Sequence, residues 1–117
     1  MRDLQRLEAV IRTVREVDGS LPIQHLHFLL IVAREHENGG VGYDELERLL
    51  ATTNATVSRI TRYLGTYMVR QKSGAMKDKG KGWVETRPDP TRPKFFLVTL
   101  SKAGQKFCKK LSSILNR

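Results

Sequence analysis

The stretch that decides the fold runs Thr53-Asn54-Ala55-Thr56-Val57-Ser58-Arg59-Ile60-Thr61-Arg62-Tyr63-Leu64. At 100° per residue, an α-helix places on one face Val57, Ile60, Thr61 and Leu64. The opposite face centres on Ala55, Arg59 and Arg62, and it is flanked by Thr56, Ser58 and Tyr63. Thr53 has a side chain that can cap the first free amides of such a helix. One face therefore packs into the protein, and the other is presented outward.

An outward face of small polar side chains and two arginines suits the major groove of DNA. That groove admits an α-helix and offers a distinct pattern of donors and acceptors at each base pair. We therefore predict that the DNA-binding residues of this helix are Thr53, Asn54, Thr56, Ser58, Arg59 and Arg62. An ordinary amphipathic surface helix has the same residue types, so the helix alone leaves both interpretations open.

Charge is distributed unevenly along the chain. Residues 1–55 contain 6 basic and 9 acidic residues, whereas residues 56–117 contain 15 basic and 3 acidic residues. The net charge of +9 therefore comes from the second half, which begins inside the candidate helix. Basicity concentrated in one segment is typical of a phosphate-binding surface. No basic stretch is paired with the strongly hydrophobic helix face of a membrane-surface helix, so we predict double-stranded DNA as the partner and no membrane.

Length and composition favour one domain over residues 1–117, because 117 residues with 39% hydrophobic content can bury one core. No apolar run approaches the roughly 20 residues that span a bilayer, and the N-terminus lacks a signal-like apolar core. We therefore expect a cytoplasmic protein. Cys108 is the single cysteine, which excludes an internal disulfide and a cysteine-cluster zinc site.

Hydrophobic periodicity predicts three further helices before the candidate reading helix. Residues 3–17 have apolar side chains at three- and four-residue steps, and residues 22–37 are apolar on most sides, as in a central core helix. A short helix over 43–50 is separated from the Thr53 cap by only two residues. Two helices joined so tightly over residues 43–64 predict a helix-turn-helix.

The last third of the chain changes from helical to strand-like periodicity. Residues 83–87 and 94–100 are β-branched and aromatic runs separated by a proline-rich turn, which predicts a β-hairpin over 83–100. Ser101 can then cap a final helix over 101–117. A helix-turn-helix followed by a basic hairpin is a winged helix. The expected fold class is mainly α with a small β-hairpin (α+β).

These segments resemble the multiple-antibiotic-resistance regulators, the MarR family. Members often have Thr-Val-Ser-Arg in the recognition helix, a wing of the form Val-Glu-x-Arg-Pro-Asp-Pro, and a strand ending Val-Ser/Thr-Leu-Thr/Ser-x-x-Gly. The corresponding segments here are Thr56-Val57-Ser58-Arg59, Val84-Glu85-Thr86-Arg87-Pro88-Asp89-Pro90 and Val98-Thr99-Leu100-Ser101-Lys102-Ala103-Gly104. The resemblance covers roughly residues 5–115 and is most specific in the wing.

The sequence departs from the family pattern in two places. Family members usually pass from the recognition helix to the wing in a few residues, whereas residues 65–82 here form a basic insertion. We expect its second half to be mobile, either as a loosely held solvated loop or as a contact with phosphates or a protein partner. At the wing tip, the arginine that family members use in the minor groove aligns with Pro93. The wing contacts with DNA are therefore assigned to Arg87, Arg92 and Lys94.

The resemblance implies a homodimer in which helices 1–17 and 101–117 of each subunit pack together. Both helices have stripes more apolar than a solvated terminal helix requires, so each needs a partner surface. The candidate interface residues are Leu4, Leu7, Ile11, Val14, Phe107, Leu111 and Leu115. The alternative is that both helices simply cover the core of their own subunit.

The sequence offers no clear catalytic or metal-ligand set. His25 and His27 are two residues apart and do not share a helix face, and His36 is more than two turns away. Lysines near Cys108 favour a reactive thiolate, but its place on the apolar stripe favours simple burial. We predict a non-enzyme without a cofactor. The resemblance allows a small aromatic effector, although no residue identifies one.

We therefore expect a dimeric transcriptional regulator that binds DNA through its recognition helix and wing. One alternative is a winged-helix protein that binds DNA for replication, recombination, packaging or architecture, which would account for the high charge. Another alternative is a winged-helix module that binds a protein partner.

Overall fold

The computed structural model describes residues 1–66 and 68–117; Tyr67, in the predicted insertion, lies outside the described residues. Within these residues the helices are α1 (Arg2–Val17), α2 (Ile23–Glu35), the 3-10 turn η1 (His36–Asn38), α3 (Tyr43–Leu50), α4 (Asn54–Leu64) and α5 (Lys102–Leu115). The strands are β1 (Val41–Gly42), β2 (Met68–Arg70), β3 (Met76–Asp78), β4 (Val84–Pro88) and β5 (Phe96–Leu100). The predicted α+β fold class is confirmed.

The predicted helix over 22–37 is interrupted near its end. Its α-helical part stops at Glu35 and continues as the 3-10 turn η1, after which two glycines reverse the chain. Gly40 has a φ of +107°, and a Cβ there would lie 2.7 Å from the carbonyl oxygen of Val98. The glycine therefore lets the backbone come close to β5 and start β1.

A three-stranded antiparallel sheet, in the order β1-β5-β4, supports the helix-turn-helix. The pairs Val84↔Leu100 and Thr86↔Val98 set the register of the β4–β5 hairpin, and Val41↔Val98 adds β1 to the other edge of β5. The hairpin was predicted from its β-branched and aromatic runs and from the proline-rich turn between them. Strand β1 was not predicted, since two residues are too few to give a periodic signal.

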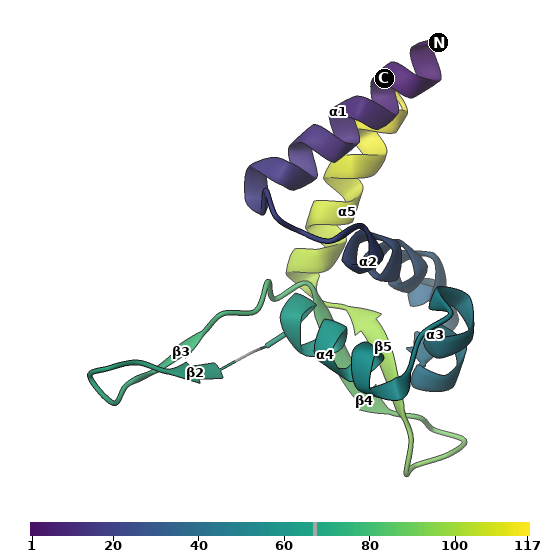
Figure 1. Cartoon of the computed structure of the whole chain (residues 1–117). Helices are drawn as coiled ribbons and strands as arrows, with labels where there is room; N and C mark the ends of the chain where they lie inside the picture. The colour runs from purple at the N-terminus through teal and green to yellow at the C-terminus, as the bar shows by residue number, and fades with distance from the viewer. Residues whose placement is uncertain (67) are drawn as a thin grey trace.

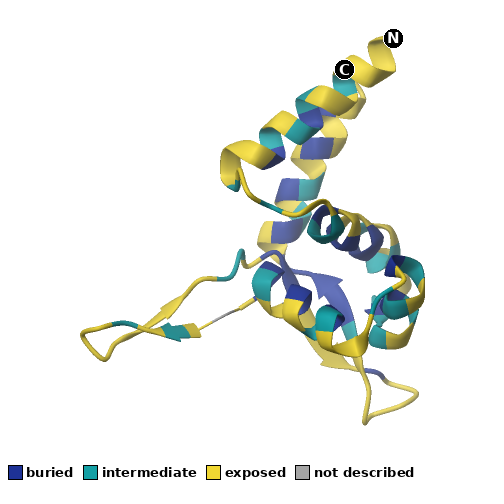
Figure 2. Ribbon diagram, in the orientation of Figure 1, coloured by how far each residue is buried: buried dark blue, intermediate teal, exposed yellow. Residues whose placement is uncertain are grey.

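Helices α2, α3 and α4 cover this sheet and enclose the core (Figure 1). The apolar face predicted for α4 is buried, and Figure 2 shows the same dark blue inner stripe on the neighbouring helices. The largest fully buried side chains are Phe28, Leu29, Leu46, Ile60, Leu64, Val32, Val57 and Val98. Burial of this many large apolar groups fixes the orientation of α4 relative to the sheet.

Helix α5 starts at the end of the sheet and packs along α1, so that the two terminal helices project together from the body (Figure 1). Ser101 caps α5 as predicted, because its hydroxyl accepts a hydrogen bond from the Gly104 amide at 3.0 Å. The rings of Trp83 and Phe107 stack with centroids 4.4 Å apart. A Cβ on Gly104 would lie 1.9 Å from the Trp83 carbonyl oxygen, so glycine is required for this close approach.

Candidate nucleic-acid interface

Helix α4 presents the arginines that were assigned to DNA recognition. Thr53 caps the helix by accepting a hydrogen bond from the Thr56 amide at 3.3 Å. Burial of Val57 and Ile60 on the inner side turns Arg59 and Arg62 outward, and both are exposed. The helix therefore has a packed face and a charged face, as the spacing of its residues at 100° per residue predicted.

The side chains at the start of α4 form a small polar network. The hydroxyl of Thr53 donates to that of Thr56 at 3.2 Å, and Arg59 Nη2 donates to the Thr56 hydroxyl at 3.1 Å. Asn54 is exposed and Ser58 is half-buried beside this network. The network holds the Arg59 guanidinium over the first turn of the helix, which lowers the entropy lost when it binds an acceptor.

Tyr63 does not belong to the outward face, contrary to our expectation. Its hydroxyl donates a hydrogen bond to the carboxylate of Asp18, which follows α1. Its ring meets the ring of His25 edge to face at 4.9 Å, and the ammonium of Lys81 lies 3.1 Å from the Asp18 carboxylate. This group, the Asp18 cluster, ties the end of α4 to the turn between α1 and α2.

The Asp18 cluster perturbs the pKa of its own members. The Tyr63 hydrogen bond, with further help from Lys81 and Ser20, holds the pKa of the Asp18 carboxyl far below its usual range. The same contact with Asp18 raises the pKa of Tyr63. Burial lowers the pKa of His25, whose Nδ1 is a buried atom without a hydrogen-bond partner among the described residues. The cluster is therefore built around one ionised carboxylate and a neutral histidine.

The wing residues predicted to bind DNA differ in the contacts that they make within the protein. Arg87 is exposed on β4, but its guanidinium donates to the carbonyl oxygen of Gly39. Arg92 lies 3.5 Å from Asp89 and 3.9 Å from Asp44, with its guanidinium 4.7 Å from the centre of the Phe95 ring. These arginines help to hold the shape of the wing, a role that the sequence did not suggest.

Lys94 is an exposed cation at the wing tip, next to Pro93. It lines a shallow hollow between the wing and the start of α4, together with Asn54, Tyr43 and Arg92. The turn that holds it is fixed by Asp89, whose carboxylate accepts hydrogen bonds from the Thr91 amide at 2.9 Å and hydroxyl at 2.8 Å. The structure therefore brings Lys94 and Asn54 to one hollow, which is also lined by Asp44 and Glu47.

The insertion over residues 65–82 is not a loosely held loop, so that interpretation was wrong for its described part. Strands β2 and β3 pair antiparallel within it, in the register Met68↔Asp78, Val69↔Lys77 and Arg70↔Met76. Figure 1 shows this second hairpin projecting from the end of α4, on the opposite side from the β4–β5 wing.

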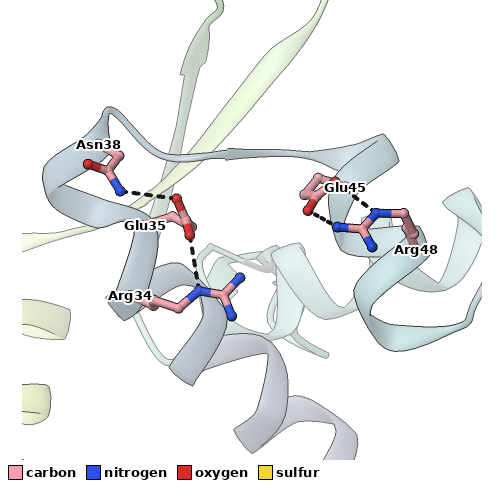
Figure 3. Close-up of polar contacts among 5 residues, drawn as sticks. All are labelled: Arg34, Glu35, Asn38, Glu45 and Arg48. Atoms are coloured by element: carbon pink, nitrogen blue, oxygen red, sulfur yellow. Dashed lines mark hydrogen bonds and ion pairs between the residues drawn. The ribbon is translucent and has the colours of Figure 1, made fainter.

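Among the described residues, three of the six arginines in residues 1–55 pair with a nearby carboxylate, namely Arg12, Arg34 and Arg48. Arg34 lies 3.0 Å from Glu35, which also accepts a hydrogen bond from Asn38, and Arg48 pairs with Glu45 on α3 (Figure 3). The Arg48 contact lowers the pKa of Glu45. The positive field of the protein therefore arises mainly from the region after residue 56, which includes α4, both hairpins and α5.

The residues proposed for the dimer interface divide into two groups. Val14, Phe107 and Leu111 are buried within the single subunit, so that part of both stripes covers its own core, as the alternative interpretation held. Leu4, Leu7 and Leu115 are 53%, 48% and 45% exposed, and Ile11 is half-buried. Leu4 and Leu7 lie in the N-terminal half of α1 and Leu115 ends α5, and both chain ends lie at the same end of the α1–α5 pair (Figure 1).

The structure also shows the surroundings of the remaining candidate residues, Cys108 and His36. Burial raises the pKa of the Cys108 thiol to about 11, which disfavours the thiolate that a redox sensor needs. His36 Nδ1 accepts a hydrogen bond from the Leu100 amide at 3.2 Å. No group of three or more potential metal ligands occurs among residues 1–66 and 68–117. Over the same residues, no helix is both long and apolar enough to cross a bilayer.

Solved structures share this arrangement of helices, sheet and wing over nearly the whole chain. RV1404 from Mycobacterium tuberculosis has a TM-score of 0.66 and 19% identity, covering 94% of this chain and 64% of its own. A mutant of MepR from S. aureus has a TM-score of 0.64 and 17% identity, covering 99% and 72%. A mutant MarR from E. coli, in complex with operator DNA, has a TM-score of 0.60 and 18% identity, covering 95% and 69%. The fold is that of MarR.

The resemblance that the sequence motifs suggested is thus confirmed at the level of the fold. No protein-family model matches the chain. Transcription factor E from Aeropyrum pernix is 31% identical over 64 residues, which are 55% of this chain and 34% of that protein. The chain therefore spans about a third of the length of this curated relative and about two thirds of RV1404.

Proposed function

We propose that the protein is a transcriptional regulator that binds duplex DNA with α4 in the major groove. The observation that carries this proposal is the outward face of α4, where Arg59 and Arg62 are exposed beside a basic wing. In helix-turn-helix proteins the second helix lies in the major groove, and a mutant MarR of the same fold was solved in complex with operator DNA. The similarity to a protein named Transcription factor E supports a role in transcription.

In this proposal the polar side chains at the start of α4 and the wing have different tasks. Arg59 contacts a base edge, because its guanidinium is held over the first turn by Thr56. Lys94 contacts phosphates or the minor groove. Arg87 and Arg92 make the same kind of contact if they exchange their present partners. Thr53, Asn54, Ser58 and Arg62 complete the surface.

The test starts with selection of a preferred site from random duplexes, followed by affinity measurements on that site and on a random duplex at two salt concentrations. Arg59→Ala should weaken binding to the selected site by about 1–3 kcal/mol and flatten the preference at one or two positions. Arg12→Ala is the matched control, since Arg12 is an exposed arginine on α1 that pairs with Glu8 at 2.9 Å. Equal loss from both variants would refute the assignment of Arg59.

The wild-type protein also distinguishes the alternative functions. Equal affinity for selected and random duplexes, with a steep salt dependence, would favour an architectural DNA-binding role over regulation. Absence of binding even at low salt would favour a module that binds a protein partner.

We also propose that the regulator is a homodimer joined at the free end of the α1–α5 pair. Leu7→Glu would place a charge against a partner without disturbing the subunit core, because Leu7 is 48% exposed. Leu30→Glu is the matched control, since Leu30 on α2 is equally exposed. Sedimentation should show a dimer for the wild type and the control, and a folded monomer for Leu7→Glu. A monomeric wild type at micromolar concentration would refute the dimer.

A further inference from the structure

The hairpin formed by β2 and β3, here called the insertion hairpin (residues 68–82), has a defined turn at its tip. The amide of Gln71 donates to the carbonyl of Ala75 at 2.7 Å, and the amide of Gly74 donates to the carbonyl of Gln71 at 2.9 Å. Gly74 has a φ of +88°, which suits the tight reversal. The insertion thus has the construction of a wing rather than of a linker.

The root of the insertion hairpin is joined to the C-terminal end of α4. The amides of Lys81, Gly82 and Trp83 donate to the carbonyls of Tyr63, Gly65 and Leu64, respectively, at 2.8–3.0 Å. These bonds satisfy carbonyls that a helix end otherwise leaves without partners.

Two further contacts fix the same root. A Cβ on Gly80 would lie 2.1 Å from the Gly65 carbonyl oxygen, so the returning chain runs directly against the end of the helix. The ammonium of Lys81, whose side chain is 22% exposed, lies 3.1 Å from the Asp18 carboxylate. The direction of the insertion hairpin is therefore set by α4 and by the turn that follows α1.

The outer part of the insertion hairpin has little of its surface covered. Every residue of β3 is exposed, and Met68 and Met76 are 46% and 50% exposed. A two-stranded hairpin without a packed face is only marginally stable in water. Such a hairpin is suited to binding a partner that covers its exposed side chains.

The charge of the insertion hairpin identifies a polyanion as that partner. Residues 68–82 contain the cations Arg70, Lys72, Lys77, Lys79 and Lys81 and the single carboxylate Asp78. Asp78 accepts a hydrogen bond from the Gly80 amide at 2.8 Å, near the root. The distal charge is therefore almost wholly positive, and the hairpin that carries it projects from the end of α4, whose outward face presents two arginines (Figure 1).

We propose that the insertion hairpin is a second wing, which contacts the phosphate backbone of duplex DNA on the side of α4 opposite to the β4–β5 wing. This proposal rests on the proposed function and extends it, because it adds a contact outside the core site. At about 3.3 Å per residue, the five steps from Lys79 to Gly74 reach roughly 16 Å beyond the root. That reach covers several phosphates, since duplex DNA has one negative charge per about 1.7 Å of its axis.

The test compares the affinity for a core duplex with that for a duplex extended by one helical turn at each end. The second-wing variant replaces with glutamine the four distal cations Arg70, Lys72, Lys77 and Lys79. The control variant makes the same change in charge at four exposed lysines of α5, namely Lys102, Lys106, Lys109 and Lys110. Thermal unfolding of both variants checks that these exposed substitutions leave the fold intact.

The wild type and the α5 control should bind the extended duplex more tightly than the core duplex, by 10-fold or more. The second-wing variant should lose this gain and keep its affinity for the core duplex within about threefold. On the extended duplex, the slope of log affinity against log salt should become shallower by about 0.9 for each lost phosphate contact.

Several results would overturn the second wing. An equal loss in the α5 control would assign the effect to net charge alone, and an unchanged extension gain in the second-wing variant would show that the hairpin touches no DNA. In the second case, the exposed methionines would point to a protein partner instead. Failure of the proposed function is distinguishable, because the wild type would then bind neither duplex.

Discussion

Replacing Asp18 with alanine removes a carboxylate at which three segments of the chain meet. Its oxygens accept hydrogen bonds from the Tyr63 hydroxyl and from the amide and hydroxyl of Ser20, and they lie 3.1 Å from the Lys81 ammonium. The Asp18 side chain is only 9% exposed. The substitution therefore leaves a tyrosine hydroxyl and a lysine ammonium without their shared acceptor.

The expected loss of stability follows from these contacts. A hydrogen bond to a charged group is worth about 1.5–3 kcal/mol, and breaking a fully buried ion pair costs about 3–5 kcal/mol. The Lys81 side chain is 22% exposed and keeps some water, so the full buried-pair cost does not apply. We expect Asp18→Ala to lower the free energy of unfolding by about 2–4 kcal/mol, which is roughly 8–16 °C in Tm for a chain of this size.

Urea unfolding at pH 7, followed by the fluorescence of the buried Trp83, measures this loss. Tyr63→Phe is the matched control, because it removes one hydrogen bond to Asp18 and leaves the Lys81 contact in place. It should cost about 1–2 kcal/mol, less than Asp18→Ala. A loss below about 0.5 kcal/mol for Asp18→Ala would refute the structural role of the cluster.

The difference in stability between the wild type and Asp18→Ala should also depend on pH. The pKa of Asp18 in the folded protein is held well below its ordinary value of 3.8, chiefly by the Tyr63 hydroxyl. The stability that it contributes is therefore fully present above that value and is lost as the pH falls toward the folded pKa. The difference in stability between wild type and Asp18→Ala should shrink between about pH 4 and pH 2. A constant difference down to pH 2 would contradict the ionised carboxylate.

Three further substitutions or treatments test the packing. Gly104→Ala should destabilise the protein by about 3 kcal/mol or more in thermal unfolding, because the new Cβ would lie 1.9 Å from the Trp83 carbonyl oxygen; a loss under 1 kcal/mol would contradict this. Thr53→Ala should lower the free energy of unfolding in urea by about 1 kcal/mol, because the α4 cap is lost. An unchanged free energy would refute the capping role of Thr53. Cys108 should be alkylated by iodoacetamide at pH 8 at least tenfold more slowly in the native protein than in urea, because burial raises its pKa to about 11. Equal rates would show that the thiol is accessible.

Local signals account for the parts of the fold that the sequence predicted well. The bounds of α3 and α4, and the caps at Thr53 and Ser101, agree with the periodicity and with the N-cap residues that precede each helix. These features depend on residues within one or two turns of each other. The wing motif was equally local, since its strands are separated by a short proline-containing turn.

The parts that were missed depend on contacts between distant residues. Tyr63 was placed on the outward face because helical spacing does not reveal Asp18, which lies 45 residues earlier. Arg87 likewise meets the carbonyl of Gly39, 48 residues away. The insertion was taken for a loop because both faces of β3 are exposed, so its sequence has no apolar alternation. The turn at Gly74 was the one available sign of a hairpin.

The hydrogen bonds that close the root of the insertion hairpin have a consequence for how this protein can change over generations. The chain leaves the end of α4 and comes back to the same helix end, where the Trp83 amide meets the Leu64 carbonyl at 2.8 Å. The intervening segment can therefore grow, shrink or be exchanged while both of its neighbours stay in register. A lineage could acquire such a segment in one step, and a protein engineer could graft a different peptide at the same junction without redesigning the body.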